Sequence, residues 1–495
     1  MRSKVIVAAA LLAVGPPVRL AACQCPDGTP PPCGPPRPPP PPSVAVLYFD
    51  NLSRDTADAY LADGLTEEII VRLGRVSRLS VKSRYEALRV RGRPGGDAAS
   101  LGRALNAAFL VSGSFQRSGT RFRVRVELVR ASTRARVWGD VFDRTSSDVL
   151  AIEEEIAGAV VERVAGQLLP TERSTIGRRP TSDPVAYDLY LRGNFLAGRF
   201  SERDLRAAIA LYEQAIARDS AFVLAYRGLA YAWSFLADDF LAPRDAYPQA
   251  QRAIERALAI DSSAAVLGWT LPMLVLDFDV PRAEQRARRA LELDPDLPDA
   301  NWGMMWVRWA QGRLDEATVY SRRAWDRDTL SFPGAVLHIQ ALVGARRYEE
   351  LEAFLPRVTA IVPREELRGT EGIVRQGRGD CEGAVAPLRA AHQFINRLHL
   401  VPALVCAGRR DEARAQLDSL LAERRSRYVP GSVLAIGFAA IGDLDQAFAW
   451  LDRALAERDA ELLFLVAGPE YDPLRGDQRF ATLLRRTWLA GRPER

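Results

Sequence analysis

The stretch GRRDEA at residues 408–413 recurs 34 residues later as GDLDQA at residues 442–447. In both copies a turn glycine precedes a charged segment that can begin a helix. Alanine pairs seven residues apart follow the same register: Ala208 and Ala215, Ala250 and Ala257, Ala283 and Ala290, Ala317 and Ala324, Ala384 and Ala391, and Ala447 and Ala454. Seven residues are nearly two helical turns, so each pair lies on one stripe where a neighbouring helix can approach. The pattern predicts a series of helical hairpins.

These hairpins resemble tetratricopeptide (TPR) repeats, whose period is 34 residues. Tyr226, Leu229, Ala230 and Trp233 are similar to the first-helix pattern W-x-x-L-G-x-x-Y of that family. We therefore expect about eight TPR-like hairpins over residues 185–460, forming a superhelical solenoid.

The repeat period is irregular in two places. One interval is eight residues too long, and the excess is predicted to form a loop insertion within residues 238–248, between the two helices of one hairpin. Between Gly344 and Gly408 the period drifts and the motif fades, so the hairpins are least clearly marked there. A polar hinge is expected at residues 171–184, before the first hairpin.

A different pattern occupies residues 43–170, where short strands are mixed with helices in the predicted order β-α-β-α-β-β-β-α. Arg121, Arg123 and Arg125 alternate with apolar residues, so the three arginines lie on one face of a strand. This face could be an anion or RNA platform, but a solvated outer face is the favoured interpretation. The predicted fold class is α+β multidomain: a small α/β domain followed by an all-α TPR-like superhelical solenoid.

The α/β region resembles the TolB-like amino-terminal domain that is often joined to tetratricopeptide repeats in bacterial proteins. The resemblance rests on residues 44–53, 61–70 and 110–114, together with Trp138 and the segment 142–144. It implies a fold and a domain partnership. It implies no catalytic residue.

The N-terminus is typical of a targeting segment. Arg2 and Lys4 flank the start of an apolar run at residues 5–14, which has the length of a signal-peptide core and is too short to span a membrane. The sequence Leu-Ala-Ala-Cys at residues 20–23 resembles a bacterial lipobox and implies lipidation of Cys23, with an uncleaved anchor or ordinary cleavage as alternatives. Residues 1–22 are therefore predicted to be a signal peptide or anchor, and the rest of the chain to be extracytoplasmic, tethered to the membrane in the periplasm.

Residues 23–42 are rich in proline, which predicts a stiff stalk between membrane and folded body, although a disordered linker fits equally well. Further along the chain, 67 basic residues are interspersed with 62 acidic ones. Nucleic acid would require a clustered basic stripe, so it is not an expected partner. The expected partners are proteins or peptides, and the membrane through the N-terminal lipid or anchor.

The short motifs HExxH, GxSxG, GxGxxG and GxxxxGK[ST] are absent. From this absence the chain is predicted not to be an enzyme, to have no catalytic residues and to bind no cofactor. Cys381, His392, His399 and Cys406 could suggest a metal site, but convergence of all four is not expected and no metal site is predicted. A disulfide between Cys381 and Cys406 is the better hypothesis, because both cysteines are expected at one rim of adjacent hairpins.

Trp302, Trp306 and Trp309 form an apolar stripe on one predicted helix. Exposed tryptophan is enriched at binding hot spots, so these residues are candidate contacts for a peptide in the concave groove. The alternative is an interhelical core, which the first-helix pattern favours.

Residues 471–480 resemble the closing segment seen after such repeats, and residues 461–495 are predicted to be a C-terminal capping segment. We expect them to form a cap in which Phe480, Leu483, Leu484 and Trp488 cover the last hairpin.

The predicted function is that of a non-enzymatic protein–protein interaction scaffold of the bacterial cell envelope, which binds peptide or protein partners in a TPR groove. The alternative is a sensory or regulatory module that binds a small ligand in the α/β domain, near Asp50 and Asp63, and signals through the repeats.

Overall fold

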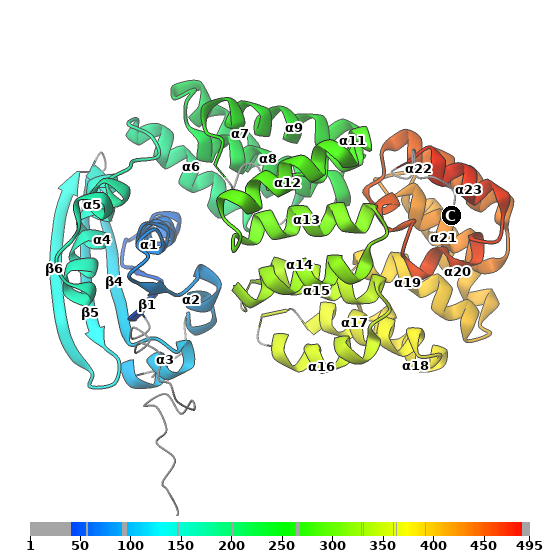
Figure 1. Ribbon diagram of the computed structural model, residues 1–495, viewed down its shortest axis with the longest axis horizontal. Helices are drawn as coiled ribbons and strands as arrows, with labels where there is room; N and C mark the ends of the chain where they lie inside the picture. The colour runs from blue at the N-terminus through cyan, green and yellow to red at the C-terminus, as the bar shows by residue number, and fades with distance from the viewer. Residues whose placement is uncertain are drawn as a thin grey trace, which may run out of the picture. The chain divides into compact units, whose positions relative to one another are not determined.

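The computed structural model describes residues 41–55, 58–91, 97–145, 148–199, 201–263, 268–327, 329, 331–359, 361–362, 364–391 and 393–487. This part of the chain is mostly helical, with one small mixed sheet near its beginning (Figure 1). The predicted signal segment, the lipidation residue Cys23 and nearly all of the predicted stalk lie outside the described residues. Among the described helices, none is long and apolar enough to cross a membrane.

The sheet has the strand order β3-β1-β4-β5-β6, and the short β2 pairs with β4. Its strands are β1 (Ser43–Val46), β2 (Asp50–Asn51), β3 (Ser80–Val81), β4 (Phe109–Ser118), β5 (Arg121–Arg130) and β6 (Ala135–Thr145). β1 is parallel to β3 and β4, whereas β4, β5 and β6 form an antiparallel meander. Along β5 the arginines at alternate positions are exposed and the apolar residues between them are buried.

Helices pack against the apolar face of the sheet, with α1 (Ala59–Gly74) and α4 (Val149–Ala165) sharing its core. Two helices, α2 (Arg84–Val90) and α3 (Ala98–Leu105), lie between β3 and β4 where one was predicted. α2 begins with a capping box. The Ser83 side chain accepts a hydrogen bond from the backbone N–H of Glu86, and the Glu86 side chain accepts one from the backbone N–H of Ser83. A further helix, α5 (Pro170–Ile176), lies within the predicted hinge.

Eight consecutive helical pairs follow in the described residues, running from green to red in Figure 1. The pairs are α6 (Pro184–Ala197) with α7 (Glu202–Arg218), α8 (Val223–Asp239) with α9 (Pro243–Ile260), α11 (Leu271–Asp277) with α12 (Val280–Leu293), α13 (Pro298–Ala310) with α14 (Leu314–Arg327), α15 (Phe332–Gly344) with α16 (Tyr348–Val358), α17 (Arg364–Gly377) with α18 (Cys381–Arg389), α19 (Gln393–Cys406) with α20 (Arg410–Glu423), and α21 (Gly431–Ile441) with α22 (Leu444–Glu457).

The alanine stripes lie where helices meet. Ala208 and Ala215, for example, are fully buried, as are Ala250 and Ala257, because a side chain this small lets two helix backbones approach. Turn glycines adopt positive φ between the helices of a pair, as Gly442 does at 92°.

The predicted loop insertion within residues 238–248 is wrong. α8 has 17 residues and α9 has 18, compared with 13 in α13 and 14 in α14, and only residues 240–242 separate α8 from α9. The surplus residues therefore lengthen two helices. Pro243 is tolerated because it stands at the first position of α9, where no backbone N–H partner is needed.

The drift of the period between Gly344 and Gly408 has a structural cause. α16 has only 11 residues and α18 only nine. Compared with α14, which has 14 residues, α16 lacks nearly one turn and α18 lacks more than one, so the sequence loses its 34-residue spacing although paired helices continue.

After α22 the chain forms two short 3₁₀ helices, η3 (Ala460–Phe464) and η4 (Pro469–Leu474), and then α23 (Gln478–Arg485). Phe480 and Leu483 of α23 are buried in the same core as α21 and α22. Leu484 packs partly buried against that core, and Trp488 lies outside the described residues.

Candidate functional site

The three tryptophans of α13 do not share one environment. Trp309 is only 1% exposed, whereas Trp302 and Trp306 are partly exposed. Trp309 reaches this depth because Gly344 of α15 leaves room for it: a Cβ at Gly344 would lie 2.3 Å from the indole ring. Trp309 is therefore a core residue, which corrects its assignment as a groove contact. Trp302 and Trp306 remain the candidate contacts, and we call their surface the α13 face.

The chain's own C-terminal segment covers part of the α13 face. Phe464 of η3 packs edge-on against Trp309 with ring centroids 5.0 Å apart, and against Trp306 at 6.3 Å. Leu462, Leu465 and other apolar residues of this segment are buried. The contact was not predicted, and the signal that could have indicated it is the apolar run at residues 462–466.

Polar contacts hold the segment at both ends. Asp459, which precedes η3, is buried and accepts hydrogen bonds from Ser432 N at 2.9 Å and Ser432 Oγ at 2.8 Å. Burial raises the pKa of Asp459 to about 6. At the other end, both oxygens of Asp472 accept from Arg346 at 2.7 Å. Burial raises the pKa of Asp472, but hydrogen bonds from Arg346 and Arg475 outweigh it, so that the pKa is lowered.

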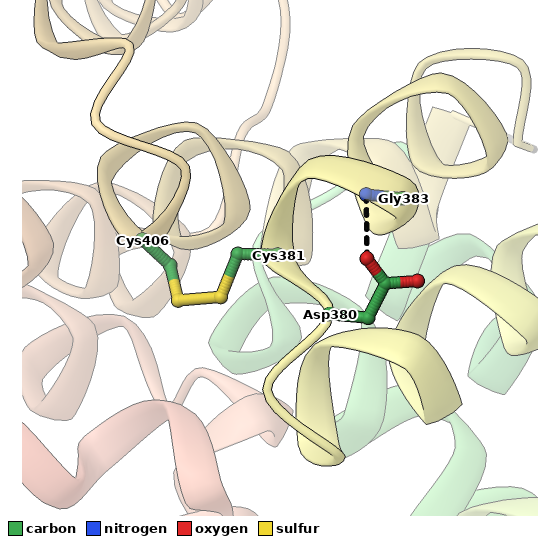
Figure 2. The surroundings of a disulfide bond; sticks show 4 residues. All are labelled: Asp380, Cys381, Gly383 and Cys406. Carbon is green, nitrogen blue, oxygen red and sulfur yellow. Dashed lines mark hydrogen bonds between the residues drawn. A yellow bond between two sulfur atoms is a disulfide. The ribbon is translucent and has the colours of Figure 1, made fainter.

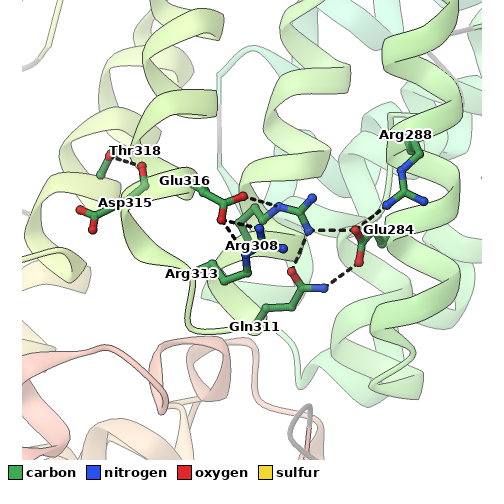
Figure 3. Close-up of polar contacts among 8 residues, drawn as sticks. All are labelled: Glu284, Arg288, Arg308, Gln311, Arg313, Asp315, Glu316 and Thr318. Atoms are coloured by element: carbon green, nitrogen blue, oxygen red, sulfur yellow. Dashed lines mark hydrogen bonds and ion pairs between the residues drawn. The ribbon is translucent and has the colours of Figure 1, made fainter. Parts of the chain in front are cut away.

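A polar cluster connects α13 to the neighbouring helices α12 and α14 (Figure 3). Arg308 of α13 is buried, and its guanidinium pairs with Glu284 of α12 at 2.9 Å and with Glu316 of α14 at 3.1 Å. Gln311 accepts from Arg308 at 2.7 Å and donates to Glu284 at the same distance. The cluster joins three successive helices, so the orientation of the α13 face depends on its neighbours.

Cys381 and Cys406 form a disulfide in the structure, with their Cα atoms 5.6 Å apart (Figure 2). It connects the first residue of α18 to the last residue of α19, which belongs to the next pair. A surface hollow of about 300 Å³ lies beside it, lined by Glu382, Val385, Ala386, Arg389, Ala390 and Arg409.

The described residues contain no group of three or more histidine, cysteine, aspartate or glutamate side chains that could hold a metal ion. His392 lies outside them. Burial lowers the pKa of His399 to about 4, so this imidazole is neutral at physiological pH.

A second polar cluster, missed in the sequence, joins the α/β part to the first helical pair. Arg72 of α1 is fully buried and pairs with Glu68 at 3.1 Å and with Glu153 of α4 at 3.4 Å. Tyr187 of α6 donates to Glu153 at 2.9 Å. Burial, followed by the charge of Glu68, raises the pKa of Glu153 well above its usual range. No local motif indicates such a cluster, because Glu153 and Tyr187 lie far from Arg72 in the sequence.

The small-ligand alternative finds little support near Asp63. Arg91 donates to both oxygens of this carboxylate, at 2.7 and 3.0 Å. The interior of the α/β part is filled by apolar side chains such as Phe115, Val124 and Ile156. On the outer face of β5, Arg121 and Arg123 both pair with Asp143, as a solvated face would.

No family model matches the chain. A 187-residue stretch is 29% identical to a protein of Rhizobium meliloti (strain 1021) named "Putative adenylate cyclase 3". The match covers 38% of this chain and 32% of that protein, so the chain spans about a third of the length of this curated relative.

This relative contradicts the prediction that the chain is not an enzyme, because its name is that of an enzyme. The prediction rested on the absence of short motifs. Such motifs reveal only catalytic groups that lie close together in the sequence, whereas folding can bring distant residues into one site.

Solved structures similar to the chain include both TolB and TPR proteins. TolB from Acinetobacter baumannii is 18% identical, with a TM-score of 0.20 over 25% of this chain and 28% of that one. YrrB, described as a TPR protein with an unusual peptide-binding site, is 18% identical, with a TM-score of 0.24 over 40% of this chain and 96% of that one. Similarities of this size carry no argument about partners.

Proposed function

We propose that the chain is an interaction scaffold of the bacterial cell envelope that binds a protein or peptide segment on its helical pairs. The observation that carries this proposal is the series of eight helical pairs in the described residues. Stacked pairs of this kind form long continuous surfaces, and repeat proteins use such surfaces for binding.

The α13 face is the proposed contact region. Trp302 and Trp306 present partly exposed aromatic surface, and large aromatic side chains next to a packed core commonly dominate binding energies. The buried Arg308 cluster and the packing of Phe464 fix the helix from two sides. A partner would therefore meet a surface that is already ordered, and little conformational entropy would be lost on binding.

Two observations support an extracytoplasmic location. The disulfide between Cys381 and Cys406 is the kind of bond that persists in oxidising compartments. The N-terminal sequence has the charge and length of a signal segment followed by a lipobox-like Cys23. Incorporation of labelled palmitate that disappears in Cys23→Ser would support the lipid tether. Equal labelling of both proteins would exclude Cys23 as the lipidated residue.

The binding proposal is tested by affinity capture from detergent-solubilised envelope, with the full chain as bait. We expect a retained partner to be lost with the Trp302→Ala/Trp306→Ala double variant. The matched control is Trp450→Ala, because Trp450 lies on α22, the second helix of its pair, and packs beside Arg453 and Arg424. A partner that is retained equally by all three proteins would place the contact elsewhere.

A second candidate function follows from the name of the curated relative. The chain could share in adenylate cyclase activity, either directly or as a part that accompanies a catalytic domain. Purified full chain incubated with ATP and Mg²⁺ or Mn²⁺ should then form cyclic AMP. If no more cyclic AMP forms than with heat-denatured protein, direct catalysis by this chain is excluded.

A further inference from the structure

The two halves of the Cys381–Cys406 disulfide differ in exposure. Cys381 is 9% exposed, whereas Cys406 is an exposed residue at the end of α19. Figure 2 shows the bond reaching from the start of α18 to the end of α19. A thiol arriving from solvent therefore meets the sulfur of Cys406 before that of Cys381.

We propose that Cys406 is a thiolation site, at which a low-molecular-weight thiolate forms a mixed disulfide and releases Cys381 as a thiolate. An electron pair of the incoming sulfur makes the new bond to Cys406 Sγ. The pair that joined Cys406 to Cys381 leaves with Cys381 Sγ, so the incoming sulfur enters the disulfide state and Cys381 becomes a thiolate, while Cys406 remains in a disulfide. A second thiolate can then attack the mixed disulfide, releasing Cys406 as a thiolate and forming the small-molecule disulfide.

The position of Cys381 favours it as the leaving group. It is the first residue of α18, where unpaired backbone N–H groups and the helix dipole stabilise negative charge. Thiol–disulfide exchange is faster when the departing thiolate is more stable. The greater exposure of Cys406 and the greater stability of the Cys381 thiolate therefore both favour attack at Cys406.

Asp380 restrains this reaction. Its Oδ1 accepts a hydrogen bond from Gly383 N at 3.0 Å, which caps α18 and places a carboxylate directly before Cys381 in the chain (Figure 2). A neighbouring negative charge disfavours a second one. Asp380 should therefore slow the release of Cys381 without preventing it.

The surface hollow is lined by residues close to both cysteines in the chain, although neither cysteine lines it. Glu382, which follows Cys381, and Arg409, three residues beyond Cys406, both contribute to its lining. Arg409 pairs with Glu382 at 3.3 Å and Arg389 pairs with Glu412 at 2.8 Å. These charges offset one another, so the site should accept neutral and anionic thiols alike.

The bond links the second helix of one pair to the first helix of the next, so thiolation would leave that junction held by packing and by ion pairs such as Arg409–Glu382 and Arg389–Glu412. α18, at nine residues, is among the short helices of the repeat region. A redox-dependent change in structure would therefore be centred on the helical pairs α17–α18 and α19–α20. This inference is independent of which partner the scaffold binds.

The first test treats the native full chain with reduced glutathione, quenches with acid, alkylates the free thiols and maps the peptides by mass spectrometry. We expect the glutathione adduct on Cys406 and the alkyl group on Cys381. Peptide mapping separates both from the three N-terminal cysteines. An adduct on Cys381 would overturn the proposal, as would the absence of any adduct under conditions that modify the urea-unfolded chain.

The second test measures the rate of reduction by 2-mercaptoethanol in Asp380→Asn, which keeps a capping side chain but removes the charge. We expect an acceleration of roughly two- to five-fold. Asp443→Asn is the matched control, because Asp443 caps α22 through Gln446 N at 3.1 Å in the same way but has no cysteine beside it. Equal rates in wild type and Asp380→Asn, or equal acceleration in both variants, would contradict the assigned leaving group.

Discussion

Three ionisable side chains, Arg72, Glu68 and Glu153, meet in the interior between α1 and α4. Two carboxylates facing one guanidinium would leave an unbalanced charge in the buried interior. The raised pKa of Glu153 reduces this imbalance, because burial favours its protonated form, which would leave one ion pair and one neutral hydrogen-bonding group. Tyr187 extends the arrangement into α6, so the α/β part and the first helical pair share one polar contact.

Removing Arg72 should therefore cost far more stability than neutralising Glu153. We expect Arg72→Met to lower the free energy of unfolding by about 3–5 kcal/mol, because it leaves a buried carboxylate without its partner. Glu153→Gln should cost much less, since burial already favours the neutral form of this carboxyl group. Urea denaturation measures both, with Arg206→Met as the control for an exposed pair to Glu202 in α7. Equal losses in Arg72→Met and Arg206→Met would contradict the account.

His338 is the basis of a pH prediction. It is 1% exposed, lies 2.8 Å from Ser321 Oγ, and burial lowers its pKa to about 4. The unfolded chain, with an ordinary histidine pKa near 6.5, binds the proton more readily. The contribution of His338 to the free energy of unfolding is therefore complete above pH 6.5. As the pH falls toward 4 this contribution is lost, and the free energy of unfolding drops by up to about 3 kcal/mol.

The measurement compares unfolding free energies of wild type and His338→Gln between pH 7 and pH 4. The comparison is needed because Asp459, whose pKa is raised to about 6, changes the stability with pH in the opposite direction. Its contribution to the free energy of unfolding is greatest below about pH 4 and is lost as the pH rises through 6. We expect the difference between the two proteins to shrink or reverse on acidification. A difference that stays constant with pH would show that His338 does not titrate as proposed.

At the scale of elements, the segment formed by η3 and η4 is anchored to helices far away in the sequence. Phe464 meets α13, and Asp472 meets Arg346 beside α15, across 126 residues. We expect Phe464→Ala to destabilise the protein by about 2–4 kcal/mol through the cavity beside Trp309. Hydrogen exchange should rise in peptides from both α13 and residues 460–474. A rise confined to the C-terminal peptides would mean that the segment does not support α13.

The same elements show where sequence reasoning succeeds and where it stops. Alanine stripes such as Ala250 and Ala257 predict helix contacts because burial against a nearby helix directly constrains side-chain size. The length of α8 and α9 was not predictable in this way, since Pro243 can end one element or begin another. The apolar run around Phe464 indicates that this segment is buried, but its contact with Trp309 depends on how the whole stack brings distant segments together, which no local pattern records.

At the scale of the molecule, the repeat region is a chain of neighbouring contacts closed by its own C-terminal segment. One apolar core runs from Ala230 to Leu483, and the Arg308 cluster ties α12, α13 and α14 together within it. Stability in such a stack is the sum of each unit and its interfaces. The α13 face lies within this braced part, which is why we assign it the partner contact.

Site-specific photocrosslinking tests that assignment most directly. A photoreactive phenylalanine analogue replaces Trp302 in the full chain, expressed in the cells from which it comes, and the analogue at Trp450 serves as the reference. The account predicts a discrete crosslinked partner at position 302 and none at position 450. Crosslinking at neither position, or the same product at both, would contradict binding at the α13 face.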